Sequence, residues 1–230
     1  MADDGPMQRL VAGVHHFQSQ VFTSQRSLFE HLAQGQDPDT LLITCSDSRI
    51  NPNLITQTLP GELFLMCNAG NLVPPYGASS GGEGATIEYA VAGLGVQHII
   101  VVGHSQCGAI AALLDPESVK SMPAVRAWLG HAETARRLVS DAYPPTLTRE
   151  QKVNVATQEN VLCQLENLRT HPCVAVAMAR GKLHLHAWVY KMAEGEVFAY
   201  DPERGQFAPV TEIRRTVTPK PNRTVNVRPI

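Results

Sequence analysis

The chain has 230 residues, of which 43% are hydrophobic and 17% charged, and its formal net charge is −2. This composition suits one globular domain with a sizeable core, and so small a charge excludes a global field that would favour nucleic acid or an anionic membrane. No apolar run approaches the roughly 18 residues of a membrane span, and the acidic N-terminus shows no apolar signal segment. We therefore expect a cytoplasmic protein with neither nucleic acid nor a membrane as partner.

Residues 1–33 are predicted to form a helical arm. Leu10, Val14, Phe17 and Val21 recur at helical spacing and make one apolar stripe. Such a stripe packs either on its own core or on a second copy of the chain. A turn over residues 34–38, rich in Gly, Asp and Pro, ends the arm.

The predicted core spans residues 34–203 and alternates strands with helices. Short apolar runs rich in Ile and Val indicate strands of a buried, mostly parallel sheet. Strands are expected at 40–45, 61–67, 98–102, 183–190 and 197–201, the last at the sheet edge. Helices are expected after Asn51 and at 85–94, 106–114, 122–141 and 148–169. The sequence thus predicts a single α/β domain with helices flanking a central sheet, and a basic tail over 204–230.

Reactive side chains follow directly after two of these strands. Cys45, Asp47 and Arg49 leave one strand, and His104 and Cys107 leave the other. Ligands collect at the carboxyl ends of strands in open α/β sheets. Two thiols and one imidazole make a three-point zinc site, and a catalytic zinc keeps its fourth position open for water.

The spacing of Asp47 and Arg49 predicts a charge-assisted pair beside that metal. The pair would keep Asp47 ionised and turned away from zinc. Its carboxylate could then accept a hydrogen bond from a zinc-bound water, the source of a zinc hydroxide nucleophile.

The remaining cysteines and histidines favour structural roles. Five cysteines at irregular spacings are better explained as ligands or buried thiols than as disulfides. We expect small buried thiols at Cys163 and Cys173 and favour the same at Cys67, where an exposed, oxidisable thiol is the alternative. His184 and His186 share one face of a strand, where a structural role is favoured over a proton shuttle.

The two motifs together resemble the signature of the β-class carbonic anhydrases. They are Cys45-Ser46-Asp47-Ser48-Arg49 and Gly103-His104-Ser105-Gln106-Cys107-Gly108, and the resemblance runs from about residue 7 to residue 200. It implies an enzyme with one Zn²⁺ per subunit that interconverts carbon dioxide and bicarbonate through a zinc-bound hydroxide. The likeness is to the plant-type, open-site subgroup. Within it the chain looks most similar to cyanobacterial carboxysomal members without their C-terminal extension.

The resemblance also implies a substrate pocket and an assembly. Plant-type members carry a Gln, a Phe and a Tyr around the substrate, which fall on Gln36, Phe64 and Tyr89 here, and the backbone N–H of Gly108 would help to bind bicarbonate. N-terminal helices of the family pack on a neighbouring subunit, so a homodimer or a higher homo-oligomer is expected. A carboxysome or another scaffold is a candidate partner.

Several alternatives remain open at this point. Gly103-His104-Ser105 resembles part of a hydrolase nucleophile elbow, and Cys45 suggests a thiol phosphatase or sulfurtransferase. A third alternative is a non-enzymatic module with a purely structural zinc site, which would be favoured if Asp47 were a permanent fourth ligand. Closer alternatives are a carbon disulfide or carbonyl sulfide hydrolase on the same scaffold and a non-catalytic zinc-binding homologue.

Overall fold

The structure is a computed structural model that describes residues 5–78 and 81–212. It divides into an N-terminal unit that ends at Asp37 and a core unit that begins at Pro38. Most of the predicted basic tail, from residue 213 on, lies outside the described residues.

The described part of the N-terminal unit is helical, as the sequence predicts, but broken into pieces. Helix α1 (Pro6–His16) passes through a π-helical turn (Phe17–Val21) into α2 (Phe22–Ser24), and α3 (Arg26–Leu32) follows. The rings of Phe17, Phe22 and Phe29 pack together, with centroids 5.4–6.4 Å apart. No residue of α1 is buried, and Leu10 and Val14 are 65% and 54% exposed.

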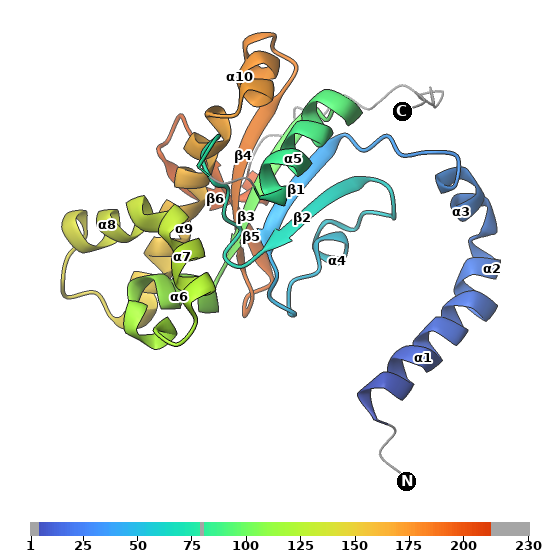
Figure 1. Cartoon of the computed structure of the whole chain (residues 1–230), viewed down its shortest axis with the longest axis horizontal. Coiled ribbons are helices and arrows are strands. Elements are labelled where there is room, and N and C mark those ends of the chain that lie inside the picture. The colour runs from blue at the N-terminus through green and yellow to red at the C-terminus, as the bar shows by residue number, and fades with distance from the viewer. Residues whose placement is uncertain (1–4, 79–80, 213–230) are drawn as a thin grey trace. The chain divides into compact units, whose positions relative to one another are not determined.

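A six-stranded sheet forms the centre of the core unit (Figure 1). Its spatial order is β2-β1-β3-β4-β5-β6, and the strands from β2 to β4 are parallel while β5 and β6 are antiparallel. The predicted α/β fold with a mostly parallel sheet is therefore confirmed. The strands are β1 (Thr40–Cys45), β2 (Leu63–Asn68), β3 (His98–His104), β4 (His184–Lys191), β5 (Glu196–Asp201) and β6 (Gln206–Pro209).

Helices supply the apolar side chains that bury the sheet. The main core gathers side chains of β1 and β3 with those of α9, α10 and the segment 82–94. A second core lies among α6, α7 and α8 and includes Cys45 and Cys107. The helices are α4 (Pro52–Thr56), α5 (Gly82–Glu88) with its π-helical continuation (Tyr89–Leu94), α6 (Gly108–Leu114), α7 (Pro123–Leu129), α8 (Glu133–Ala142), α9 (Arg149–Arg169) and α10 (Pro172–Ala179), with 3₁₀ turns at Pro116–Val119, Gly130–Ala132 and Val210–Glu212.

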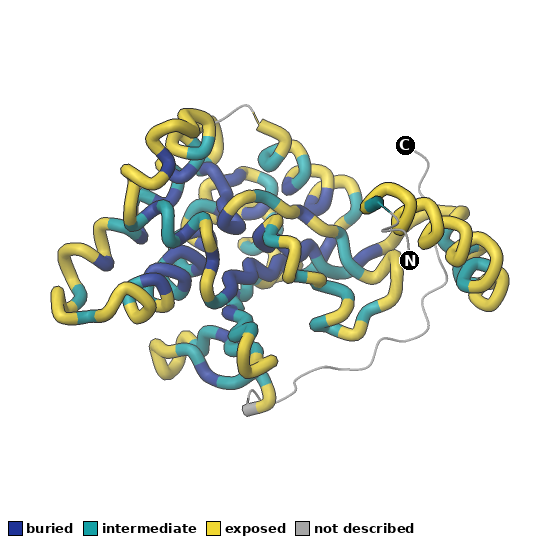
Figure 2. The backbone as a smooth tube through the Cα atoms, turned by 90° about the horizontal axis from the view of Figure 1, so that it is seen from below, coloured by how far each residue is buried: buried dark blue, intermediate teal, exposed yellow. Residues whose placement is uncertain are grey.

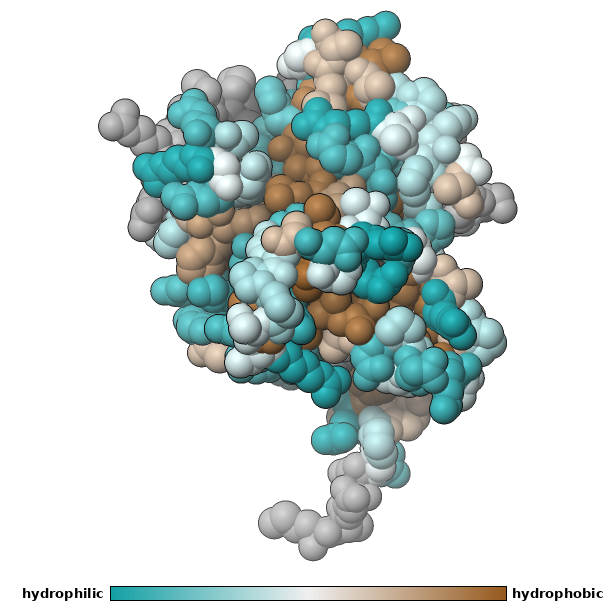
Figure 3. Space-filling model, turned by 90° about the vertical axis from the view of Figure 1, so that its left-hand side faces the viewer, coloured by the Kyte–Doolittle hydropathy of each residue, from teal (hydrophilic) through white to brown (hydrophobic). Residues whose placement is uncertain are grey.

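Burial follows this layering. The central strands β1 and β3 are buried almost throughout, and the outer sides of the helices are exposed (Figure 2). Polar side chains cover much of the face that carries α6–α8, and apolar surface shows between them (Figure 3). Among the described residues, no helix is both long and apolar enough to cross a membrane.

The structure corrects three expectations. Val197–Asp201 is not the edge strand, because β6 pairs with β5 and takes the edge, inside the segment predicted as tail. The predicted helix 122–141 is two helices joined by a 3₁₀ turn, and α10 was not predicted. Cys67 is exposed, and Cys163 and Cys173 are only half-buried.

Candidate metal centre

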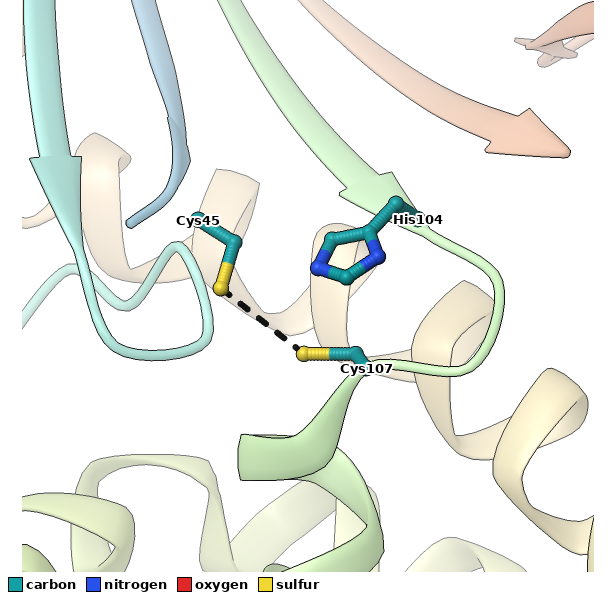
Figure 4. A group of neighbouring side chains, drawn as sticks. All are labelled: Cys45, His104 and Cys107. Atoms are coloured by element: carbon teal, nitrogen blue, oxygen red, sulfur yellow. Dashed lines mark hydrogen bonds between the residues drawn. The ribbon is translucent and has the colours of Figure 1, made fainter. Parts of the chain in front are cut away.

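Three ligand side chains meet where β1 and β3 end. Cys45 is the last residue of β1, His104 the last of β3, and Cys107 the N-cap of α6. Their ligand atoms all lie within 4.8 Å of one another, and all three residues are buried (Figure 4). Gln106 makes the turn between the last two with a left-handed backbone, at φ 56°.

The imidazole of His104 is oriented as a metal ligand would be. Its Nδ1 lies 2.9 Å from the carbonyl oxygen of Ser105. A carbonyl only accepts, so Nδ1 carries the proton and Nε2 presents its lone pair. Nε2 has no hydrogen-bond partner among the described residues, although the residue is fully buried. Because buried polar atoms rarely stay unpaired, this nitrogen fits a metal ion.

The two cysteine sulfurs of the cluster lie in contact with each other. The Sγ atoms of Cys45 and Cys107 are 3.9 Å apart. Hydrogen bonding from Cys107 lowers the pKa of Cys45 to about 4, against the opposing effect of burial. The same contact, together with burial, raises the pKa of the Cys107 thiol. Two cysteine sulfurs and one free imidazole nitrogen form a donor set that suits zinc, which binds cysteine as the thiolate.

Asp47 lies beside this cluster but is held by Arg49. The guanidinium donates from Nε to Oδ1 at 2.9 Å and from Nη2 to Oδ2 at 2.8 Å, and the Arg49 backbone N–H donates to Oδ1 at 3.0 Å. These hydrogen bonds hold the pKa of Asp47 well below its usual range. Oδ2 lies 3.9 Å from Nε2 of His104. The carboxylate is thus ionised, adjacent to the ligands and committed to Arg49.

Comparisons with known proteins now decide the family. The family model described as carbonic anhydrase matches residues 40–197, more than half of the chain. A carbonic anhydrase of Synechocystis sp. is 52% identical over 196 residues, which cover 85% of this chain and 71% of that protein. The solved structure of the β-carbonic anhydrase CcaA superposes with a TM-score of 0.86 at 50% identity, covering 88% of this chain and 98% of the other.

The chain belongs to the β-carbonic anhydrase family. It is therefore an enzyme of the carbonate dehydratase class. A structure described as one of two tetrameric β-carbonic anhydrases from the fungus Sordaria macrospora is more distant. It is 28% identical, with a TM-score of 0.76 over 84% of this chain and 95% of the other.

The residues that the family resemblance assigned to the substrate pocket are dispersed. Phe64 and Tyr89 lie together, with ring centroids 5.9 Å apart. Phe64 pairs with Leu41, however, whereas Cys45 pairs with Asn68. Four residues along a strand place the Phe64 position about 13 Å from the Cys45 row. Gly108 is exposed next to Cys107, and Gln36 belongs to the N-terminal unit.

Ser105 does not behave as a nucleophile of the hydrolase type. Its Oγ accepts a hydrogen bond from the backbone N–H of Met192 at 2.9 Å, and its carbonyl orients His104. In this β-carbonic anhydrase fold the serine therefore supports the histidine ligand.

Sequence reasoning overlooked a group of residues that surrounds Cys45. The backbone N–H of Gly70 donates to its Sγ at 3.4 Å, and the loop carrying Gly70 is bound by Trp128, Asn160 and Gln164. The signal was present: amide side chains recur at 160, 164 and 167 on α9, beside the apolar residues Val161, Leu165 and Leu168 at helical spacing.

Proposed function

We propose that this chain catalyses the zinc-dependent, reversible hydration of carbon dioxide to bicarbonate and a proton. The observation that carries the proposal is the buried Cys45-His104-Cys107 cluster with its unpaired imidazole nitrogen, beside a carboxylate that is held off the cluster. One zinc per subunit would be held by these three residues. When bound, it would make a water molecule acidic enough to act as a nucleophile near neutral pH.

The surrounding residues have distinct roles in this proposal. The Ser105 carbonyl fixes the His104 tautomer, so Nε2 is the nitrogen that binds. Asp47 remains an acceptor, because Arg49 keeps it ionised and leaves Oδ2, which accepts a single hydrogen bond, a further lone pair. Oδ2 of Asp47, which lies beside the cluster, would accept a hydrogen bond from the reacting water and so orient it toward carbon dioxide. The backbone N–H of Gly108, an exposed residue next to Cys107, would donate to a bicarbonate oxygen.

The substrate pocket supports a homo-oligomeric enzyme. Within one subunit, Phe64 is displaced along the sheet from the Cys45 row, by about 13 Å. If Phe64 and Tyr89 form the apolar wall that carbon dioxide needs, a second copy of the chain must bring them to the cluster. Gln36 would hydrogen-bond bicarbonate. The tetrameric fungal relatives are consistent with such an assembly. We propose a cytoplasmic location, with the carboxysome as the alternative compartment, as the family resemblance implies.

Stopped-flow measurement of carbon dioxide hydration on zinc-loaded protein tests the proposal. We expect one zinc per subunit, activity that is lost after chelation, and activity that returns with zinc. Carbon disulfide and carbonyl sulfide, assayed in parallel, should be poor substrates, since the relatives are named carbonic anhydrases. A protein with one zinc per subunit that does not hydrate carbon dioxide would overturn the proposal.

A further inference from the structure

One peptide group beside the cluster is held from both ends. It joins Ala69 to Gly70, in the loop after β2. Its N–H donates to Sγ of Cys45 at 3.4 Å, and its carbonyl oxygen accepts the indole N–H of Trp128 at 2.8 Å. The two bonds lie at opposite ends of one planar dipole, so the indole both fixes the plane of the peptide and polarises its N–H.

A ladder of buried amides holds the next part of the loop. Asn160 donates from Nδ2 to the carbonyl oxygen of Gly70 at 3.0 Å, and Gln164 donates to Oδ1 of Asn160 at 2.9 Å. Oε1 of Gln164 accepts from the backbone N–H of Val73 at 2.8 Å. Asn167 closes the ladder by donating to the Val73 carbonyl oxygen at 2.8 Å.

These amides are unusual occupants of a core. Asn160 and Gln164 are both 0% exposed, on a face of α9 that otherwise buries aliphatic side chains. Burying such groups is costly unless each hydrogen bond is made, and apolar residues would fill the space without that constraint. The amides do not contact the metal ligands. Their hydrogen bonds end on the loop that presents Gly70 to Cys45.

A hydrogen bond to a thiolate changes what the sulfur can give to a metal. The donated N–H stabilises negative charge on Sγ and so reduces its electron donation, which leaves the bound metal a stronger Lewis acid. Small rotations of the 69–70 peptide would weaken this bond. Gly70 itself has little room to move, because it adopts φ +82° and a Cβ there would lie 3.2 Å from Cβ of Ala109.

We propose that Trp128, Asn160 and Gln164 are positioning residues that aim the Gly70 N–H at Cys45 and thereby tune the sulfur as a metal ligand. The inference rests on the proposed metal-dependent function. It assigns to an indole and two buried amides, none of which touches the metal, a part in setting the acidity of the site.

The test uses cobalt(II)-substituted protein, in which the sulfur-to-cobalt charge-transfer band reports electron donation by the thiolates. Trp128→Phe keeps an aromatic ring and removes only the N–H donor. Trp188→Phe, at the other tryptophan and on β4, is the matched control. We expect Trp128→Phe to move the band to longer wavelength and to raise the pH midpoint of activity. Metal binding should weaken by about tenfold, the lower end of what outer-shell changes cause. The control should match the parent protein.

Each outcome decides a separate question. If the parent protein does not bind cobalt or zinc stoichiometrically, the proposed function fails before the inference is reached. If it does, and Trp128→Phe leaves the band and the pH midpoint at parental values, the inference is wrong even when metal affinity falls. Should Trp128→Phe not fold, Asn160→Leu is measured in its place. This near-isosteric change removes the donor to the Gly70 carbonyl and must move the band in the same direction.

Discussion

At the scale of single residues, Arg49 determines where the Asp47 carboxylate stands. The guanidinium binds both carboxylate oxygens, whereas Oδ2 lies only 3.9 Å from a ligand nitrogen. Without the guanidinium, the nearest cation available to the carboxylate would be a metal at the cluster. The bidentate pair with Arg49 therefore keeps Asp47 available as a hydrogen-bond acceptor and prevents it from becoming a fourth metal ligand.

We expect Asp47→Asn to retain zinc and to lose activity by about 100-fold or more, because the amide is not an equivalent charged acceptor. Arg49→Ala should also lower activity, by releasing Asp47 toward the metal. Arg49→Lys is the matched control, since it keeps the charge but not the bidentate geometry. Zinc content and hydration rates of the three variants check this. Parental rates in Asp47→Asn would remove the carboxylate from the mechanism.

The sequence was sufficient to predict the cluster but not its surroundings. Cys45, His104 and Cys107 follow apolar runs, and parallel strands bring their carboxyl ends together whatever the details of packing. The Gly70 hydrogen bond depends instead on where α9 lies over a loop ninety positions earlier in the chain. No local pattern encodes that contact. The dispersal of Phe64 from Cys45 likewise depends on strand register.

At the scale of elements, Gly103 sets how closely α9 approaches β3. A Cβ at this position would lie 2.8 Å from Cγ2 of Thr157 and 2.9 Å from Cγ1 of Val161. Both contacts are shorter than van der Waals separation, so helix and strand would have to part directly behind His104.

Gly103→Ala should therefore destabilise the protein by about 1–3 kcal/mol, the usual range for overpacking a core. Gly130→Ala is the control, because a Cβ there meets no atom within 4 Å. Urea unfolding of both variants gives the comparison. Equal urea midpoints for Gly103→Ala and Gly130→Ala would show that α9 and β3 can move apart without loss of stability.

Three histidines at the amino ends of β3 and β4 form a second element-scale feature. Nδ1 of His98 lies 3.1 Å from Nε2 of His186, and the ring of His184 stacks on His98. They lie at the strand ends opposite the metal ligands, which supports the structural role expected for His184 and His186. Burial, and then the neighbouring imidazoles, lower the pKa of His186 to about 4.

A histidine whose pKa is lower in the folded than in the unfolded protein binds its proton preferentially after unfolding. Stability should therefore be complete above about pH 6.5 and decline as the pH falls toward 4. His186→Gln should flatten this decline, and His15→Gln, on the exposed α1, should not. Urea midpoints between pH 7.5 and 4.5 test the sign. A midpoint that rises on acidification would contradict it.

Elements without a distinct pattern escaped prediction. The α10 sequence is almost uniformly apolar, so it shows no helical period. Strand β6 has four residues and ends at Pro209, and only its pairing with β5 makes it a strand. The capping box of Thr148 and Gln151, by contrast, marks the start of α9 locally, and that helix was predicted nearly to the residue.

At the scale of the whole molecule, α1 carries apolar side chains that its own unit leaves exposed. Phe17 belongs to the aromatic trio with Phe22 and Phe29, but Leu10 and Val14 make no such contact and are 65% and 54% exposed. Apolar stripes of this kind mark protein–protein contacts.

Leu10→Asp combined with Val14→Asp should dissociate the expected homo-oligomer while leaving the trio intact. If a second copy of the chain completes the substrate pocket, the rate of carbon dioxide hydration should fall when the oligomer dissociates. Sedimentation velocity and circular dichroism, measured together, separate dissociation from unfolding. His15→Asp with His16→Asp, two exposed residues of the same helix, controls for the two added negative charges. An unchanged sedimentation profile would place the stripe against its own subunit.

The distance in sequence between the ligands has a consequence for folding kinetics. Cys45 and Cys107 are 62 residues apart, and they meet only after β1 has paired with β3. Closing that non-local contact is a slow folding step. A metal ion bound only to His104 and Cys107 would not speed it, because Cys45 has not yet arrived. Zinc should therefore leave the refolding rate of the chain unchanged and slow its unfolding, which stopped-flow fluorescence with and without chelator can measure. Faster refolding in zinc would contradict this order of events. If the cluster binds zinc as proposed, the protein would be made in a cell first as an empty apoenzyme, and its persistence afterwards would depend on how much zinc reaches it.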